Sequence, residues 1–210
     1  MDELLPLPPQ SLRDLSFSVI DLETTGMTPH SGWTKAGAFR AAAEITEFGV
    51  VKLQGVVVQD RFQRLCAIEG HVSPIITKIT GITGAMLADA PSLERVALEL
   101  APFVEGTVWV AHHAAFDGSF LKAYLPAGMW SRHRLICTKK LAQALIPEAR
   151  GYSLQKLCEY FGIVNTRAHR ALQDAEATAE LLQHLLGRAE AQGLSAESFL
   201  ALGELGWKAL

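Results

Sequence analysis

The segment VIDLETTG (residues 19–26) places two acidic residues, Asp21 and Glu23, directly after a run of apolar side chains. In an extended strand, side chains at positions i and i+2 point the same way, so both carboxylates are expected on one face. Two bare carboxylates about 4 Å apart repel each other by roughly 4 kcal/mol at an effective dielectric constant of about 20. Such a pair is therefore expected either in open water or around a shared cation or proton.

The spacing alone does not choose between these environments, because Asp174 and Glu176 repeat it later in the chain. A solvated strand end is the simpler interpretation of the first pair. Its position favours a functional site, since Thr24, Thr25 and Gly26 predict a tight turn immediately after the carboxylates. In α/β sheets, sites form where strands end in such turns.

Two later segments contain further acidic side chains and a histidine. In AHHAAFDGSFL (residues 111–121), Asp117 follows a predicted strand near the predicted start of a helix, where an N-cap role is the alternative. In AHRALQDAEATAELL (residues 168–182), His169 precedes Asp174 at the start of a long predicted helix. A solvated helix face is the alternative for this second segment.

Together these residues predict one site with four negative charges, which two divalent cations would neutralise. The acids are Asp21, Glu23, Asp117 and Asp174. Oxygen ligands without thiolates favour Mg²⁺ or Mn²⁺. Two such ions roughly 4 Å apart can clamp the attacking and leaving oxygens of a phosphodiester. A neutral imidazole at His169 would take a proton from the attacking water.

The three segments resemble a known set of motifs. VIDLETTG, HHAAFD and HRALQD, in this order, are similar to the three exonuclease motifs of the DnaQ-like 3′–5′ exonucleases, the histidine-containing (DEDDh) branch of the DEDD superfamily. This family includes the proofreading ε subunit of bacterial DNA polymerase III, ribonuclease T and oligoribonuclease. The resemblance covers roughly residues 17–186, and ITEFGVVKL (residues 45–53) and KITGIT (residues 78–83) also look like family segments.

The resemblance implies an α/β fold of the RNase H-like type, in which helices flank a mixed central β-sheet. It implies that the four acids, Asp21, Glu23, Asp117 and Asp174, are metal ligands and that His169 is the general base. The tyrosine branch of the superfamily has a tyrosine close before its last aspartate. The region before Asp174 contains His169 and no tyrosine, which indicates the histidine branch.

The implied reaction is hydrolysis of phosphodiester bonds at the 3′ end of nucleic acid, preferably DNA, with release of nucleoside 5′-monophosphates. The implied partners are single-stranded or frayed 3′ ends and a polymerase or repair protein. Two alternatives stay open: an exoribonuclease of the same fold, and a non-catalytic docking or nucleic-acid-binding module. The residues assigned to substrate binding are Leu22, Thr24, Thr25, Gly26, His113 and Phe116.

Two features depart from the family pattern. His113 stands where the second motif commonly has asparagine, which puts local hydrogen bonding or the grip on the substrate strand in doubt. Residues 27–43 form a longer loop than usual and contain Trp33, Lys35, Phe39 and Arg40. Such a loop could stack a base or contact phosphates. A surface insertion with Trp33 packed against the fold is the alternative.

Hydrophobic periodicity and turn residues predict the elements that position these side chains. Strands are predicted at residues 17–21, 44–53, 56–66, 107–111 and 134–137. Helices are predicted at residues 73–81, 91–104, 118–125, 138–146, 153–161, 171–188 and 195–205. These elements form one exonuclease domain, residues 16–190. It lies between a leader, residues 1–15, and a C-terminal helical extension, residues 191–210, that packs on it or docks beside it.

The composition is that of a globular domain of 210 residues, 49% hydrophobic and 20% charged. A net charge of −3 argues against a protein that coats long nucleic acids. A local phosphate-facing stripe, with a solvated surface as the alternative, is predicted at Lys122, Arg132, Arg134, Lys139 and Lys140. The three cysteines form no CxxC motif, so reduced thiols in a cytoplasm are expected. No signal peptide is predicted, and no apolar run reaches the roughly 20 residues that cross a bilayer.

Overall fold

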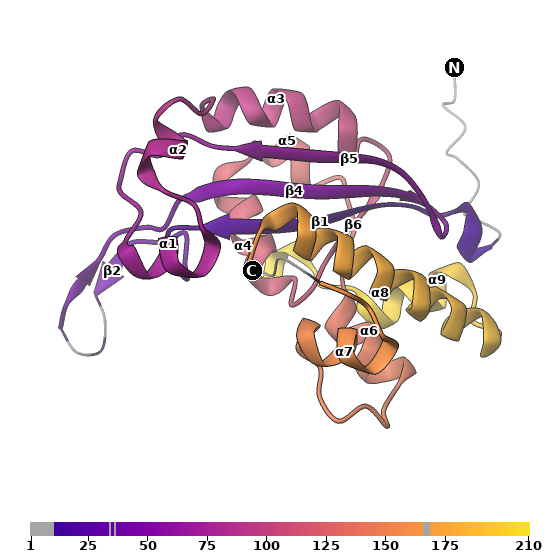
Figure 1. The fold of residues 1–210 in the computed structure, drawn as a ribbon. Helices are drawn as coiled ribbons and strands as arrows, with labels where there is room; N and C mark the ends of the chain where they lie inside the picture. The colour runs from indigo at the N-terminus through magenta and orange to yellow at the C-terminus, as the bar shows by residue number, and fades with distance from the viewer. Residues whose placement is uncertain (1–10, 34, 36, 166–168) are drawn as a thin grey trace, which may run out of the picture.

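The computed structural model describes residues 11–33, 35, 37–165 and 169–210. A five-stranded sheet lies at its centre (Figure 1), in the order β5 (Val57–Leu65), β4 (Ile45–Gln54), β1 (Ser16–Thr24), β6 (Val108–Ala111) and β7 (Leu135–Cys137). The strands β5, β4 and β1 pair antiparallel, whereas β1, β6 and β7 pair parallel. The predicted α/β fold with a mixed sheet is confirmed.

Helices cover both faces of the sheet (Figure 1). One face packs against α3 (Leu93–Val104) and α4 (Ala115–Tyr124), and the short α5 (Ala127–Trp130) follows α4. The other face packs against α6 (Thr138–Leu145), α7 (Leu154–Phe161), α8 (Ala171–Ala191) and α9 (Ala196–Gly203). At the end of the sheet where β1 finishes, β5 connects to α3 through α1 (Pro74–Thr80) and α2 (Gly84–Ala88).

The strand β1 contributes to a separate hydrophobic core on each face of the sheet. Phe17 and Val19 are buried in the core that contains α6 to α9. Ile20 and Leu22 are buried in the core that contains α3 and α4. Because alternate side chains of a strand point to opposite faces, the odd-numbered row of β1 faces α8. The acidic residues 21 and 23 continue that row.

Local signals in the sequence set several helix ends. Ser73, Thr83 and Ser153 each accept a backbone N–H at the start of α1, α2 and α7, as N-caps do. Gly81 and Gly162 end α1 and α7 in the left-handed conformation, each with φ of 73°. The predicted hairpin turn joins β4 to β5. Short-range chemistry therefore specifies these boundaries.

Other boundaries differ from the predictions. Pairing with β4 extends β1 to Thr24, so both acids lie inside the strand rather than at its end. The helix α4 begins at Ala115 rather than residue 118, and α8 continues to Ala191 rather than residue 188. The helix α5 has no predicted counterpart, because four residues are too short to show a period.

Residues 27–43, predicted as a loop, contain two short paired strands, β2 (Gly32–Trp33) and β3 (Phe39–Arg40). Of the predicted leader, residues 1–10 lie outside the described residues, and Leu12–Asp14 form a 3₁₀ turn. Within the described part of the chain, no helix is both long and apolar enough to cross a membrane.

Several basic side chains of the predicted phosphate-facing stripe hold the C-terminal segment instead. Arg134 lies between Glu197 and Glu204, at N–O distances of 2.7 and 2.8 Å. The amino groups of Lys122 and Lys140 donate to backbone carbonyls of the last seven residues. These contacts fasten α9 and the chain end to α4, to α6 and to the residue that precedes β7. They use cations that a nucleic-acid surface would need.

Candidate active site

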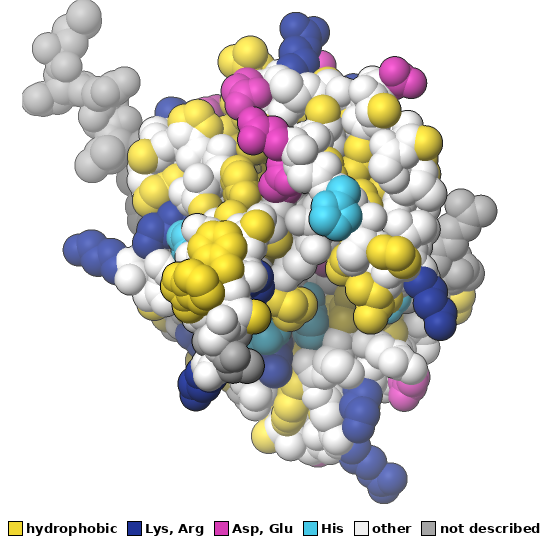
Figure 2. Space-filling model, turned by 90° about the vertical axis from the view of Figure 1, so that its left-hand side faces the viewer, with side chains coloured by type: hydrophobic (Ala, Val, Ile, Leu, Met, Phe, Trp, Pro, Cys, Tyr) yellow, Lys and Arg dark blue, Asp and Glu magenta, His cyan; other side chains and the backbone are white. Residues whose placement is uncertain are grey.

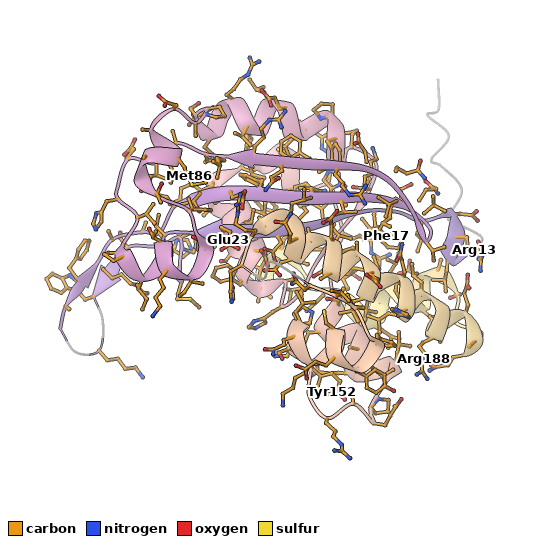
Figure 3. All side chains as sticks on the ribbon, viewed as in Figure 1. Arg13, Phe17, Glu23, Met86, Tyr152 and Arg188 are labelled. Atoms are coloured by element: carbon orange, nitrogen blue, oxygen red, sulfur yellow. The ribbon has the colours of Figure 1, made fainter. Side chains whose placement is uncertain are left out.

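The α8-facing row of β1 changes from apolar to acidic along its length. Phe17 and Val19 pack in the core, and the next two side chains of the same row are Asp21 and Glu23. Glu23 lies between the end of β1 and the start of α8, whereas Phe17 lies toward the other end of the strand (Figure 3). The sheet therefore presents both carboxylates to the first turn of α8.

That first turn brings a third carboxylate to the strand. Gly49 pairs with Asp21 across β4 and β1, and a Cβ at Gly49 would lie only 2.1 Å from the carbonyl carbon of Ala171. Because glycine has no side chain, the start of α8 rests directly on β4. Asp174 consequently joins the pair: among the described residues, carboxylate oxygens of Asp21, Glu23 and Asp174 lie within 4.8 Å of one another.

Asp117 reaches this place from α4. The pairing of β6 with β1 ends at Val19 opposite Val110, so the backbone N–H of Leu22 lies beyond the end of β6. This N–H donates to Oδ1 of Asp117 at 3.1 Å. Asp117 is 3% exposed and lies in the first turn of α4, whose N-cap is Ala114, so the alternative N-cap role of Asp117 is wrong.

The acidic side chains repel one another in a poorly solvated space. Burial, followed by the charges of Asp117 and Asp174, raises the pKa of Asp21 well above its usual range. Burial, with repulsion from Asp174 and Glu47, raises the pKa of Glu23 to about 8. Burial raises the pKa of Asp117 to about 7, although hydrogen bonds from its own backbone and from Leu22 act in the opposite direction.

This donor set fits divalent cations. All four acids offer oxygen ligands, which Mg²⁺ and Mn²⁺ prefer over sulfur. The raised pKa values of Asp21, Glu23 and Asp117 indicate that the surrounding protein groups do not fully stabilise the ionised form of these carboxylates. A bound divalent ion would remove the repulsion and restore the ionised carboxylates.

His169 lies immediately before α8, exposed to solvent. Its backbone N–H donates to Oδ2 of Asp174 at 2.9 Å. Its side chain and Asp174 line one cavity of about 660 Å³ between α7 and α8. Its φ of 68° is in the left-handed region, which is uncommon for a non-glycine residue and often marks a functional position.

Glu47 is an acidic residue of this region that the sequence did not single out. It lies opposite Glu23 in the β1–β4 pairing and is fully buried. Its carboxylate accepts hydrogen bonds from Arg170 at 2.6 and 3.0 Å and from the backbone N–H of Ala171 at 3.1 Å. Glu47 therefore anchors the start of α8 to β4. The sequence feature that could have identified Glu47 is the presence of an acidic residue inside the largely apolar segment ITEFGVVKL.

The turn after β1 is held by its own hydroxyls. The hydroxyl of Thr24 donates to the carbonyl of Gly26 at 2.7 Å. The backbone of Thr25 donates to the carbonyl of Glu44 at 2.9 Å, and its hydroxyl accepts from the N–H of Glu44 at 2.9 Å. The Leu22 side chain is 4% exposed within the core. The substrate-binding roles of these residues stay predictions.

The second motif contains two histidines with different environments. His112 bonds Thr138 and the carbonyl of Tyr152 through its ring nitrogens, and burial lowers its pKa to about 4, so it is a neutral structural group. His113 is exposed with φ of 61°, a conformation that asparagine and histidine adopt more readily than most residues. This explains how histidine replaces the usual asparagine there. Phe116 is half-buried, with its ring centroid 5.1 Å from that of Phe120.

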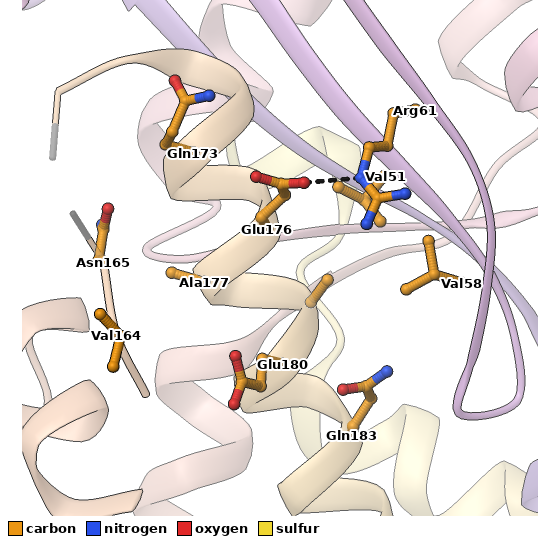
Figure 4. Close-up of a pocket in the computed structure, with 11 residues that line it drawn as sticks. Val51, Val58, Arg61, Val164, Asn165, Gln173, Glu176, Ala177, Glu180 and Gln183 are labelled. Atoms are coloured by element: carbon orange, nitrogen blue, oxygen red, sulfur yellow. Dashed lines mark hydrogen bonds and ion pairs between the residues drawn. The ribbon is translucent and has the colours of Figure 1, made fainter. Parts of the chain in front are cut away.

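Glu176, the second acidic residue of the Asp174–Glu176 pair, lies away from the carboxylate group of Asp21, Glu23 and Asp174. Glu176 lies in a groove of about 390 Å³ on the side of α8 that faces β4 and β5, and it pairs with Arg61 at 2.6 Å (Figure 4). The rest of this groove is lined by further residues of α8, by Val51 and Val58 of the two strands, and by Val164 and Asn165. Glu176 does not join the carboxylate group formed by Asp174.

Comparisons with known proteins agree with this geometry. The family model of RNase T, described as an exonuclease, matches residues 18–182. The chain is 33% identical over 178 residues to DNA polymerase III subunit epsilon of Aquifex aeolicus (strain VF5). The aligned region covers 84% of this chain and 83% of that protein. Other relatives are longer: the chain spans 29% of a Mycobacterium tuberculosis relative and 12% of a PolC-type DNA polymerase III of Caldanaerobacter subterraneus.

Solved structures share the fold. Exonuclease X in complex with 5′ overhanging duplex DNA has a TM-score of 0.65 at 28% identity, over 89% of this chain and 98% of that one. Exonuclease I of E. coli in complex with a dT13 oligonucleotide has a TM-score of 0.68 at 18% identity, over 85% of this chain and 42% of that one, and shows the fold alone. The chain belongs to the RNase T exonuclease family and is a 3′–5′ exonuclease of the DnaQ-like type.

Proposed function

We propose that this chain removes nucleoside 5′-monophosphates from single-stranded or frayed 3′ ends of DNA, with two divalent ions held by Asp21, Glu23, Asp117 and Asp174 and with His169 as general base. The observation that carries the proposal is the convergence of three carboxylates, from β1 and α8, within 4.8 Å of one another. Asp117 lies against the same stretch of backbone. Glu23 and Asp117 are buried and Asp21 and Asp174 are half-buried, which supports a role that requires a bound cation.

Each protein group has a distinct task in the proposed mechanism. Divalent ions bound by the carboxylates would polarise the scissile phosphate and acidify the attacking water. The imidazole of His169 would accept the proton of that water. The N–H of His169 and the side-chain amide of Asn165 both donate to Asp174, so the orientation of a ligand is tied to the loop that carries the base.

The choice of DNA is supported by the names of the relatives. One is a DNA polymerase III subunit and one similar structure holds duplex DNA. The resemblance to the epsilon subunit also supports a DNA polymerase as the protein partner and a cytoplasmic location. A non-catalytic module is disfavoured, because four clustered acids are costly to keep without a bound cation.

Matched DNA and RNA strands, labelled at the 5′ end, test the proposal directly. With Mg²⁺ or Mn²⁺ we expect a ladder that shortens from the 3′ end of DNA, and no shortening in excess EDTA. Faster shortening of RNA would move the substrate assignment to the exoribonuclease alternative, since discrimination then depends on the 2′-OH. No shortening of either strand would reject the proposed function.

A further inference from the structure

Two aromatic side chains project from the molecule on the hairpin formed by β2 and β3, which we call the aromatic hairpin. Trp33 and Phe39 are paired across its strands, with ring centroids 5.6 Å apart in an edge-to-face arrangement. Trp33 is 76% exposed and Phe39 is 60% exposed. The alternative in which Trp33 packs against the fold is therefore wrong.

The exposure of these rings is unusual within this chain. It contains four tryptophans, and the other three, Trp109, Trp130 and Trp207, are buried or half-buried. An aromatic ring gains most by burying its faces, each ring covering on the order of 150–250 Å². An edge-to-face pair that is left in water keeps ring faces available for a flat partner such as a nucleobase.

The base of the aromatic hairpin is fixed to the catalytic strands. Thr25, two residues after Glu23, bonds Glu44 through both its backbone and its hydroxyl. The next hydrogen bond toward the hairpin is donated by the N–H of Ala43 to the carbonyl of Thr28, at 2.8 Å. The hairpin thus extends β1 and β4 outward from the end of the sheet that carries the carboxylates (Figure 1).

The charge of the aromatic hairpin matches a phosphate backbone. Residues 27–43 contain Lys35 and Arg40 and no acidic residue, in a chain with a net charge of −3. Both cations are exposed, and neither forms an ion pair with an acid of the described residues. Figure 2, which views this end of the molecule, shows large hydrophobic side chains projecting with dark blue cations around them.

We propose that the aromatic hairpin binds single-stranded nucleic acid by stacking nucleobases on Trp33 and Phe39, while Lys35 and Arg40 contact its phosphates. This inference rests on the proposed function, since it assumes a nucleic-acid strand that leads to the carboxylates. Stacking on an aromatic side chain does not depend on base identity, so the hairpin would add affinity without sequence preference. It would hold the strand upstream of the 3′-terminal nucleotide.

Tryptophan fluorescence tests the stacking in EDTA, where no strand is cut. We expect an oligothymidylate to quench the emission of the wild-type protein and Trp33→Leu to abolish that quenching. Trp33→Leu and Phe39→Leu should each weaken binding roughly 5- to 150-fold. An abasic strand of equal length has no base to stack on either ring, so it should bind the wild-type protein at least as weakly as the oligothymidylate binds Trp33→Leu. The matched control is Val57→Ala, since Val57 is 58% exposed at the opposite end of the sheet.

Two results would overturn the inference. One is equal affinity of the wild-type protein and Trp33→Leu for the oligothymidylate. The other is a change from dimer to monomer in Trp33→Leu with unchanged DNA affinity, which would make the aromatic hairpin a protein contact. A separate reaction with Mg²⁺ distinguishes the two proposals: a wild-type protein that does not shorten the strand rejects the proposed function. Shortening by a protein whose binding ignores Trp33 rejects the hairpin's role alone.

Discussion

Two Asp-x-Glu pairs in this chain have different structures because different elements carry them. In β1, Asp21 and Glu23 share the face that looks toward α8, and Asp174 lies within 4.8 Å of both. In α8, positions i and i+2 are about 200° apart around the axis. Asp174 therefore meets β1, while Glu176 pairs with Arg61 outside the carboxylate group.

The environments of the two pairs differ as much as their directions. Glu23 is 9% exposed and its pKa is raised to about 8. The side chain of Glu176 is 40% exposed in an ion pair with Arg61, and exposed pairs stabilise a protein by about 0–1 kcal/mol. The same sequence spacing thus yields a strained acidic site in a strand and an ordinary surface ion pair in a helix.

Removing one charge from the strand pair should have the largest effect. Asp21→Asn is expected to lower the rate of mononucleotide release at least about 10³-fold, because it removes a ligand oxygen from between the other acids. Initial rates at saturating Mn²⁺ measure this, with circular dichroism to establish folding. A variant that folds and keeps more than a tenth of the activity would remove Asp21 from the metal site.

Substituting His169 should have the next largest effect, and it should change the catalytic rate rather than the affinity for metal. His169→Gln is expected to lower kcat by about 10²–10⁴-fold while Mn²⁺ affinity, measured by calorimetry, stays near that of the wild-type protein. The reason is that the ring moves a proton and is not a ligand in this account. A loss of metal affinity equal to that of Asp21→Asn would instead make His169 part of the metal site.

Substituting Gly49 tests whether the close packing of α8 on β4 brings Asp174 to Asp21 and Glu23. A Cβ at Gly49 would lie 2.1 Å from backbone carbon of Ala171, so Gly49→Ala should displace Asp174 and destabilise the fold by about 2–4 kcal/mol. Gly187 is the matched control in α8, because no atom of the described residues lies within 4 Å of its Cβ position. Gly187→Ala should stabilise the helix by about 0.5–1 kcal/mol. Equal urea midpoints for the two variants would contradict this packing.

The strand pair should also make the metal-free protein sensitive to pH. The pKa of Glu23 rises from 4.5 to about 8 on folding, so the folded chain keeps a proton that the unfolded chain has lost between these values. Stability is then complete below about pH 4.5 and decreases as the pH rises toward 8. In EDTA, the melting temperature should decrease by a few degrees across this range, and Glu23→Gln should flatten the decrease. A melting temperature that rises with pH and is unaffected by Glu23→Gln would contradict it.

The helix pair should give the smallest effect. Glu176→Gln removes one exposed ion pair with Arg61 and should change the free energy of unfolding by less than about 1 kcal/mol. Nuclease activity should stay within about twofold of the wild-type value. A large loss of activity in this variant would show that the two pairs are not as different as their geometry indicates.

Features set by short-range chemistry were accessible from the sequence. The helices predicted to begin at residues 73 and 153 do begin there, with Ser73 and Ser153 as their N-caps, and alternation along β1 placed Asp21 and Glu23 on one face. The three motifs then indicated which distant segments meet. The motif order predicts that Asp174 lies beside Asp21 and Glu23. Helix and strand periodicity alone do not predict this contact.

Features set by contacts between distant segments were not accessible. Glu47 acquires its role only when β4 pairs with β1 and Arg170, the N-cap residue of α8, lies beside it. The need for glycine at position 49 appears only once the backbone of α8 rests on β4. The aromatic hairpin depends on a two-residue pairing that is too short to produce a period in the sequence.

Diffraction from crystals soaked with Mn²⁺ tests the central claim most directly. Anomalous scattering should reveal two manganese ions, with carboxylate oxygens of Asp21, Glu23, Asp117 and Asp174 as ligands at about 2.0–2.6 Å. Glu176 should coordinate neither ion. Full occupancy of other sites with no anomalous peak among these four acids would contradict the account.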